Sequence, residues 1–200
     1  MLRRRIPSSI LMIAVLLPLL LLGACFPVPL GDPEKATADP RYVGAWLWDS
    51  EDAKHMVLIR PWDTRTYIVL LLTVDSDPDE GESAYSEIVL KGWLTEVKGN
   101  VFLSLEDVRA MARPSREEKN NKYWALKLNL AGDVLTATGL NPSFPPFEAV
   151  PSSAELERLV NEHWDNPQMW ATPIQAQRAS QAEREAFDKL AVRAATRPVR

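Results

Sequence analysis

The sequence has little of the chemistry that most enzyme and metal-site motifs require. Its 200 residues include one cysteine and two histidines, which rules out an intramolecular disulfide and argues against a zinc enzyme with Cys and His ligands. It has no Gly-x-Ser-x-Gly, no His-Glu-x-x-His and no glycine-rich phosphate loop. We therefore lean toward a non-catalytic protein, although an enzyme is not excluded.

Positive charge is also scarce once the N-terminus is set aside. The first 24 residues hold Arg3, Arg4 and Arg5 and no acid, so the remainder carries 20 basic and 27 acidic residues. A nucleic-acid surface needs clustered cations. We expect no nucleic-acid partner.

No apolar run is long enough for a typical membrane-spanning helix. The longest, residues 10–22, is interrupted by Pro18, whereas a spanning helix needs about 20 apolar residues. The run follows a basic start and precedes small residues, which is typical of a secretory signal peptide. This pattern favours a cleaved signal over the alternative, an uncleaved membrane helix.

The end of this segment resembles the bacterial lipobox. Leu22, Gly23 and Ala24 place an aliphatic and two small residues before Cys25. The resemblance implies cleavage between Ala24 and Cys25 by signal peptidase II and acylation of Cys25 with lipid such as palmitate. The alternative is an ordinary signal peptide beside an incidental cysteine. Two or three acyl chains anchor a protein almost permanently.

Localisation follows from the same resemblance. Lipoproteins without aspartate after the lipidated cysteine generally reach the outer membrane, and that position is Phe26. We expect a lipid-anchored envelope protein at the outer membrane, facing the periplasm. Residues 26–40, which contain four prolines, predict a tether outside the core that reaches up to about 45 Å from the lipid at about 3.1 Å per residue.

The body, residues 41–200, predicts a single β-rich domain followed by helices. Trp124, Leu126, Leu128 and Leu130 alternate with polar residues, as in a strand with one buried face. The run 67–72 is apolar on both faces, so its outer side needs a cover. Strands are expected near 42–48, 55–60, 66–74, 84–97, 101–106, 122–130, 134–140 and 174–178.

Two helices are expected late in the chain. Ser152 with Glu155, and Ser180 with Glu183, have capping-box spacing, which predicts helices near 153–164 and 181–195. The fold class is therefore mainly β with C-terminal helices: an antiparallel up-and-down meander that forms a barrel or a curved sheet, with two helices packed on it.

The connections between strands differ in length. In an up-and-down order, tight turns at 61–65, 98–100 and 131–132 lie at one end, and longer connections at 49–54, 75–83 and 107–121 lie at the other. Because the first strand starts at the tight end, we expect the tether to attach there. The long loops would then face away from the membrane and form a binding mouth.

The start of the first strand resembles lipocalins. Gly44 and Trp46 match the Gly-x-Trp signature of these eight-stranded barrels, in which the tryptophan closes the base and small apolar ligands bind inside. The body is thus lipocalin-like, although the first expected helix precedes the last strand. The whole layout is also similar to that of proteobacterial lipoproteins, which implies no particular activity.

Candidate binding residues are few. Trp46, Trp93 and Trp124 fall on expected strands and would contact an apolar ligand, or they simply fill the core. No cofactor is required. Asp75, Asp77 and Asp79 alternate as in a calcium loop, although a solvated acidic hairpin fits better. A second acidic cluster at the same end could complete a divalent site: Asp49, Glu51, Asp52 and His55.

These features predict a non-catalytic envelope lipoprotein that binds a small apolar or envelope-derived ligand at the long-loop end. The alternative is a structural or assembly accessory that docks another envelope protein through its acidic loops or helices. A hydrolase is a third option and would require a polar constellation inside the barrel.

Overall fold

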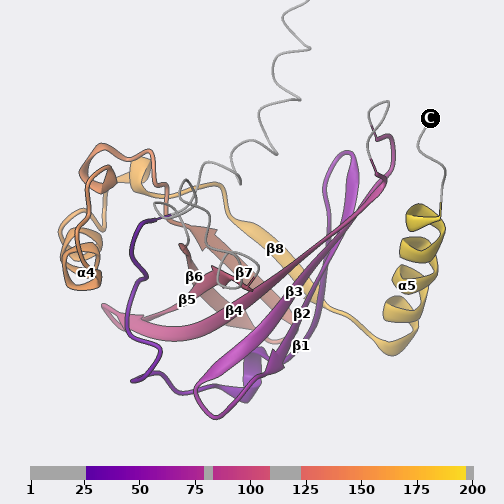
Figure 1. The fold of residues 1–200 in the computed structure, drawn as a ribbon, viewed down its shortest axis with the longest axis horizontal. Helices are drawn as coiled ribbons and strands as arrows, with labels where there is room; N and C mark the ends of the chain where they lie inside the picture. The colour runs from indigo at the N-terminus through magenta and orange to yellow at the C-terminus, as the bar shows by residue number, and fades with distance from the viewer. Residues whose placement is uncertain (1–25, 79–82, 109–122, 197–200) are drawn as a thin grey trace, which may run out of the picture.

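The computed structural model describes residues 26–78, 83–108 and 123–196, and these form a closed eight-stranded antiparallel barrel (Figure 1). The strands pair in sequence order, and β1 pairs with β8 to close the sheet. The strands are β1 (Gly44–Asp49), β2 (Ala53–Pro61), β3 (Thr66–Asp75), β4 (Tyr85–Val97), β5 (Asn100–Asp107), β6 (Tyr123–Ala131), β7 (Val134–Gly139) and β8 (Ile174–Arg178).

Two α-helices pack outside the barrel, which confirms the predicted fold class. Helix α4 (Ser153–Glu162) lies between β7 and β8, and α5 (Gln181–Ala195) follows β8. Only α5 is therefore C-terminal to the sheet. Ser152 and Ser180 cap the two helices as their spacing predicts. Three short 3₁₀-helices also occur in the described part of the chain: η1 (Pro40–Tyr42), η2 (Pro145–Phe147) and η3 (Pro167–Met169).

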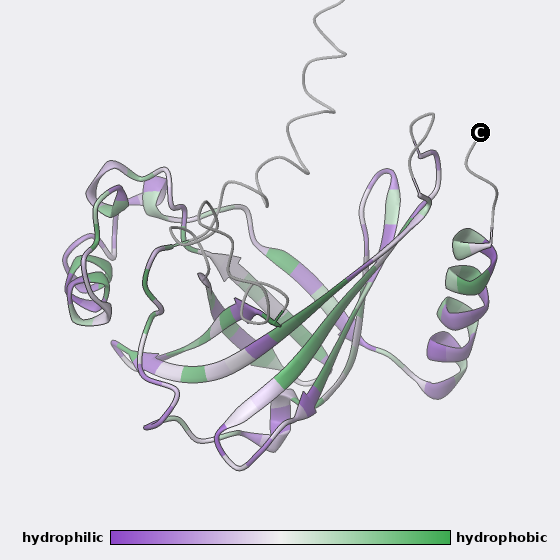
Figure 2. Cartoon of the chain, viewed as in Figure 1, coloured by the Kyte–Doolittle hydropathy of each residue, from purple (hydrophilic) through white to green (hydrophobic). Residues whose placement is uncertain are grey.

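Strand alternation divides the apolar residues between the interior and two outer layers. The interior core includes Trp46, Ile59, Tyr67, Val69 and Leu103. Residues one position away on the same strands face outward, and Figure 2 shows β3 as apolar over much of its length. A sheet that is apolar on both faces needs covers outside, and the helices and the N-terminal segment supply them.

Helix α5 is one of the two covers. Its Phe187 packs against outward-facing Ala45, Met56, Leu72 and Val74 of β1, β2 and β3. This contact explains the two-sided apolar pattern of β3.

The other cover lies over β4, β5 and β6. It combines residues 26–30 with the segment that links β7 to β8, including α4. Phe144 and Phe147 of that segment are buried here, so this proline-rich stretch packs as a crossover.

Residues 26–39, which we call the strap, do not form the predicted tether. Phe26 and Leu30 are each 1% exposed and belong to the outer core. The carbonyl oxygen of Leu30 accepts hydrogen bonds from Trp93 Nε1 at 3.2 Å and Ser104 Oγ at 2.6 Å. The prolines prevent regular secondary structure, but they do not prevent burial. Proline has no backbone N–H, so a buried proline leaves no backbone donor without a hydrogen-bond partner.

The two ends of the barrel differ as expected. We call the end with the tight β2–β3, β4–β5 and β6–β7 turns the base, and the opposite end the mouth. Gly99 and Gly132 have φ of 70° and 61° in two of these turns, a conformation that glycine adopts without strain.

The strap enters at the mouth, so the predicted attachment at the base was wrong. Phe26 forms an antiparallel bridge with Tyr123, the first residue of β6. Strand β6 runs from the mouth to the β6–β7 turn, and the strap then descends the outer face to η1 at the base (Figure 1). The prediction used only the position at which β1 begins, and this position does not show that the preceding residues run along the barrel from the mouth to the base.

Candidate functional site

The base of the barrel is closed by aromatic side chains and one arginine. Trp46 is 0% exposed and donates from Nε1 to the carbonyl of Tyr42 at 3.0 Å. The Arg178 guanidinium lies 4.2 Å from the Trp46 ring centroid and donates to the carbonyls of Val43 and Arg41 at 2.9 and 2.8 Å. Arg178 thus ties β8 to the chain around η1.

Buried phenols complete this floor. Tyr67 is 0% exposed and donates its hydroxyl to the carbonyl of Asp39 at 3.0 Å. Burial raises the pKa of both Tyr42 and Tyr67 above the usual value. Both phenols therefore stay neutral at physiological pH.

Toward the mouth the interior becomes partly accessible. Trp48, Val57, Trp124 and Leu126 pack against the interior core, yet each keeps part of its surface exposed. Trp46 and Tyr67 of the floor are thus fully buried, whereas these four side chains keep some apolar surface exposed, as do Leu94 and Val101 beside the β4–β5 turn. Partly exposed apolar side chains on a concave inner face are the kind of surface that lines small-molecule sites.

A polar cluster stands at this mouth, centred on His55. Trp48 lies directly across the β1–β2 ladder from His55, and the two rings stack with centroids 4.7 Å apart. Ser50 Oγ lies 3.1 Å from His55 Nε2, and Thr73 Oγ1 lies 3.1 Å from Nδ1. Both ring nitrogens therefore have hydroxyl partners, which hold the ring in one orientation.

The electrostatics favour a neutral imidazole. Desolvation lowers the pKa of His55, and the negative charges of Asp49 and Asp75 oppose this effect only in part. The hydroxyls of Ser50 and Thr73 occupy the one donor and the one acceptor of a neutral imidazole, so the remaining hydrogen-bonding capacity of the cluster lies on these hydroxyls. No described carboxylate is hydrogen-bonded to His55, so the cluster lacks the acid that orients the base in a catalytic triad.

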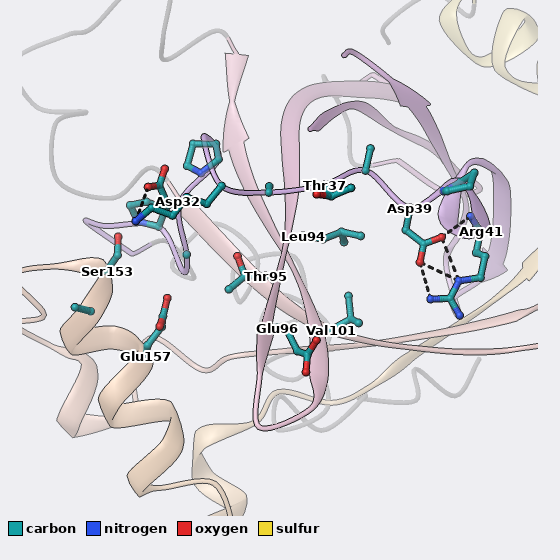
Figure 3. A pocket seen from close by; sticks show the side chains of 18 residues that line it. Asp32, Thr37, Asp39, Arg41, Leu94, Thr95, Glu96, Val101, Ser153 and Glu157 are labelled. Carbon is teal, nitrogen blue, oxygen red and sulfur yellow. Dashed lines mark hydrogen bonds and ion pairs between the residues drawn. The ribbon is translucent and has the colours of Figure 1, made fainter. Parts of the chain in front are cut away.

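A second concavity lies at the base, beneath the strap. It encloses about 1190 Å³ and opens between the strap, the β4–β5 hairpin and the start of α4 (Figure 3). Leu94 and Val101 line it and also pack against the interior core. Its rim is charged, with Asp32, Glu96 and Glu157. We call this concavity the strap groove.

The predicted tryptophans occupy three different environments. Trp46 forms the floor and Trp124 lies on the interior face near the mouth. Trp93 is 1% exposed and faces outward, where Leu30 accepts its indole hydrogen bond and Tyr123 contacts its ring. Trp93 therefore does not share the interior with the other two.

The acidic candidates are not assembled into a metal site in the described part of the chain. Asp75 Oδ1 accepts the backbone N–H of Asp77 at 2.9 Å, as in a turn. Asp49 pairs with Lys54 at 2.8 Å. No group of three potential ligands occurs within the described residues, and Asp79 lies outside them. Calcium there stays a prediction.

The lipidation candidates cannot be located in the fold, because Ala24 and Cys25 lie outside the described residues. Phe26, their neighbour, is the first residue described. Over residues 26–78, 83–108 and 123–196, no helix is both long and apolar enough to cross a membrane.

Sequence reasoning missed four contributors. Leu30 and Arg178 act through the backbone, as acceptor and donor respectively, and neither forms a motif. The hydroxyls of Ser50, in the β1–β2 connection, and of Thr73, on β3, meet His55 from two different segments. The β1–β2 and β2–β3 registers place them there, and only a correct register could have predicted it.

Comparison with protein-family models, with curated proteins and with solved structures finds no match to this chain.

Proposed function

We propose that this chain is a membrane-anchored lipoprotein of the bacterial envelope, at the outer membrane and facing the periplasm. Its barrel binds a small apolar or envelope-derived molecule through the mouth, without catalysis. The anchor rests on Leu22–Cys25 and on the signal-like segment before it.

The observation that carries the binding function is the exposed apolar surface of interior side chains near the mouth, above a buried floor. The floor is sealed by Trp46 and Tyr67, which are 0% exposed, whereas Trp48 and Trp124 are partly exposed near the mouth. Removing such apolar surface from water stabilises a complex by about 25 cal/mol per Å². A closed floor and an accessible apolar wall favour entry at one end.

The architecture supports a lipocalin-like assignment. Gly44 opens β1 and Trp46 is buried at the closed end, as the Gly-x-Trp resemblance implies. Helix α4 precedes β8, and this order departs from the lipocalin pattern. The likeness therefore concerns the barrel and its floor.

The polar cluster suggests the kind of ligand. His55 with Ser50 and Thr73 offers hydrogen-bonding groups beside the ring of Trp48. An apolar wall with a small polar group at the rim suits an amphiphile, whose tail enters the barrel and whose head stays near His55.

Native mass spectrometry tests this function. The mature Cys25→Ser domain, purified from the periplasm, should carry an added mass that denaturation removes. A Trp124→Ala variant should lose it, whereas Trp62→Ala should retain it, because Trp62 is 57% exposed in the β2–β3 turn at the base. A bare mass for a folded parent domain would reject ligand binding.

The anchor has a separate test. Replacing Cys25 by serine should move the protein from the membrane fraction to the soluble periplasm, because a residual chain without acyl groups has no anchor. Unchanged membrane association of the variant would refute lipidation at this residue.

The rival function, docking of another envelope protein, is favoured by one feature. Leu190 and Val192 of α5 are 37% and 63% exposed. Photocrosslinkers placed at Val192 in cells would trap a discrete partner if this face docks one. The absence of an adduct, together with a bound ligand in the barrel, would decide for the binding function.

A further inference from the structure

The start of the strap is fixed to the mouth end of the barrel. The Phe26 N–H donates to the Tyr123 carbonyl at 2.6 Å, and the Tyr123 N–H donates back to the Phe26 carbonyl at 3.1 Å. The Phe26 ring is 1% exposed and meets Phe147 edge-on at 5.6 Å. Two backbone hydrogen bonds and a buried ring hold this residue in place.

The strap contacts the barrel again after this point. Gly31 has φ of 76°, and a Cβ there would lie 1.8 Å from Thr95 Oγ1, so the backbone is pressed against β4. Further along, the Ala38 N–H donates to the Thr64 carbonyl at 3.1 Å. The segment expected to act as a spacer is therefore held at Phe26, at Gly31 and again at Ala38.

Cys25 is joined to Phe26 by one peptide bond, so their Cα atoms lie about 3.8 Å apart. Acyl chains on Cys25 would therefore begin beside the first residue of β6. This places the lipid attachment point at the mouth end of the barrel.

We propose that the mouth of the barrel rests against the bilayer surface, with the base directed away from it. This inference rests on the proposed lipidation of Cys25. The partner is a phospholipid bilayer, and the contact is set by the absence of free chain between the anchor and the folded domain.

The orientation gives the proposed binding function a source of ligand. An apolar molecule that leaves the bilayer near Cys25 reaches Trp48 and Trp124 over a short path. The rim also carries exposed Glu51, Asp52 and Asp77. Carboxylates are repelled by anionic headgroups, so a zwitterionic surface is the appropriate one for a test.

The test uses two single-thiol reporters in the full-length lipidated chain. The acyl group blocks the sulfur of Cys25, the native cysteine, so an introduced cysteine is the reactive one. Ser143→Cys is exposed in the segment whose Phe147 touches Phe26. Thr64→Cys is exposed in the β2–β3 turn at the base. Each is labelled with bimane and placed in phosphatidylcholine vesicles containing a headgroup-nitroxide lipid.

Quenching should be several-fold stronger at position 143 than at position 64. Strand β6 has 9 residues, which at about 3.3 Å each separates the two ends by roughly 20–25 Å after allowing for strand tilt. Inserting about 15 Gly/Ser residues between Cys25 and Phe26 is the matched control, because it adds a flexible tether. The difference between reporters should then vanish.

Two results would overturn the orientation. Equal quenching at native spacing would show a freely rotating domain, and stronger quenching at position 64 would show a base-down domain whose exposed Trp62 meets lipid. Failure of the anchor is distinguishable, since an unmodified Cys25 adds a second labelled thiol and leaves the chain outside the vesicles. That result would reject both proposals.

Discussion

The two covers of the barrel are built differently although they solve the same problem. Over β4 to β6, the strap and the α4 segment bury Phe26, Leu30, Phe144 and Phe147 in one continuous core. Over β1 to β3, α5 contributes a single buried side chain along its whole length, Phe187. The first cover is part of the core, whereas the second is a helix attached to a finished barrel.

Hydrogen bonding shows the same contrast. The Leu30 carbonyl accepts from Trp93, Thr95 and Ser104, so two barrel strands depend on the strap for their polar groups. The side-chain bonds at the start of α5 are local, as in the capping box of Ser180 and Glu183. Removing the strap would leave these buried donors without an acceptor. Each buried donor without a partner lowers the free energy of unfolding by about 1–3 kcal/mol.

Deletions should give the largest difference between the two covers. A chain truncated after Ala179, which lacks α5, should still unfold cooperatively, with a loss of about 2–4 kcal/mol for the exposed apolar surface. A chain without residues 26–38 should not fold, since Trp93 and Ser104 lose the Leu30 carbonyl that accepts their hydrogen bonds and the outer core loses two large side chains. Urea denaturation followed by tryptophan fluorescence compares them. A folded strapless domain would contradict this account.

Matched phenylalanines should give the next largest effect. Phe147 is 2% exposed in the strap-side core and Phe187 is 5% exposed under α5. Phe147→Ala should cost about 3–5 kcal/mol, as for a closely packed core. Phe187→Ala should cost less, because α5 can shift to fill the space. Equal changes in the free energy of unfolding would remove the distinction between the covers.

A smaller effect is expected at Gly31, where the strap presses on β4. Gly31→Ala meets Thr95 atoms at 1.8 to 2.7 Å. Gly99→Ala is the control, because its φ of 70° is similar and no atom lies within 4 Å of the added Cβ. The control should lose about 1–2 kcal/mol for the left-handed conformation, and Gly31→Ala should lose at least about 1 kcal/mol more. Chemical denaturation measures both, and identical losses would refute a tight strap.

Sequence alone predicted most of the barrel and little of what surrounds it. The signals that succeeded are local in the sequence: apolar alternation on β6, glycine at the turns and serine at the helix starts. Each element that these signals predicted is present. The strap has no such signal. Its prolines are typical of a spacer, and its burial depends on Phe26 and Leu30 meeting a surface far along the chain. Composition does not encode such tertiary contacts.

The candidate site divides in the same way. Trp46 was predictable from Gly-x-Trp, whereas the outward position of Trp93 depends on which face of β4 is inside. A shift of register by one residue would exchange the faces. His55 was visible only as a member of an acidic cluster, and its hydroxyl partners come from strand pairing.

The smallest predicted effect concerns pH, and it falls on the strands that α5 covers. Because burial holds the pKa of His55 below its ordinary value of 6.5, the folded chain binds fewer protons there than the unfolded chain. The stability that this provides is present above pH 6.5 and is lost as pH falls through the folded pKa. The His55→Phe variant keeps a ring beside Trp48 but has no group that titrates there. This part of the stability lost at low pH should therefore disappear in the variant. Urea midpoints at pH about 7.5 and about 5 measure it, and hydrogen exchange should show the parent loosening first in β1–β3. An equal loss of stability at low pH in the variant would show that other groups cause it. Hydrogen exchange that begins in β4–β6 would show that the strap side of the barrel opens before the side covered by α5.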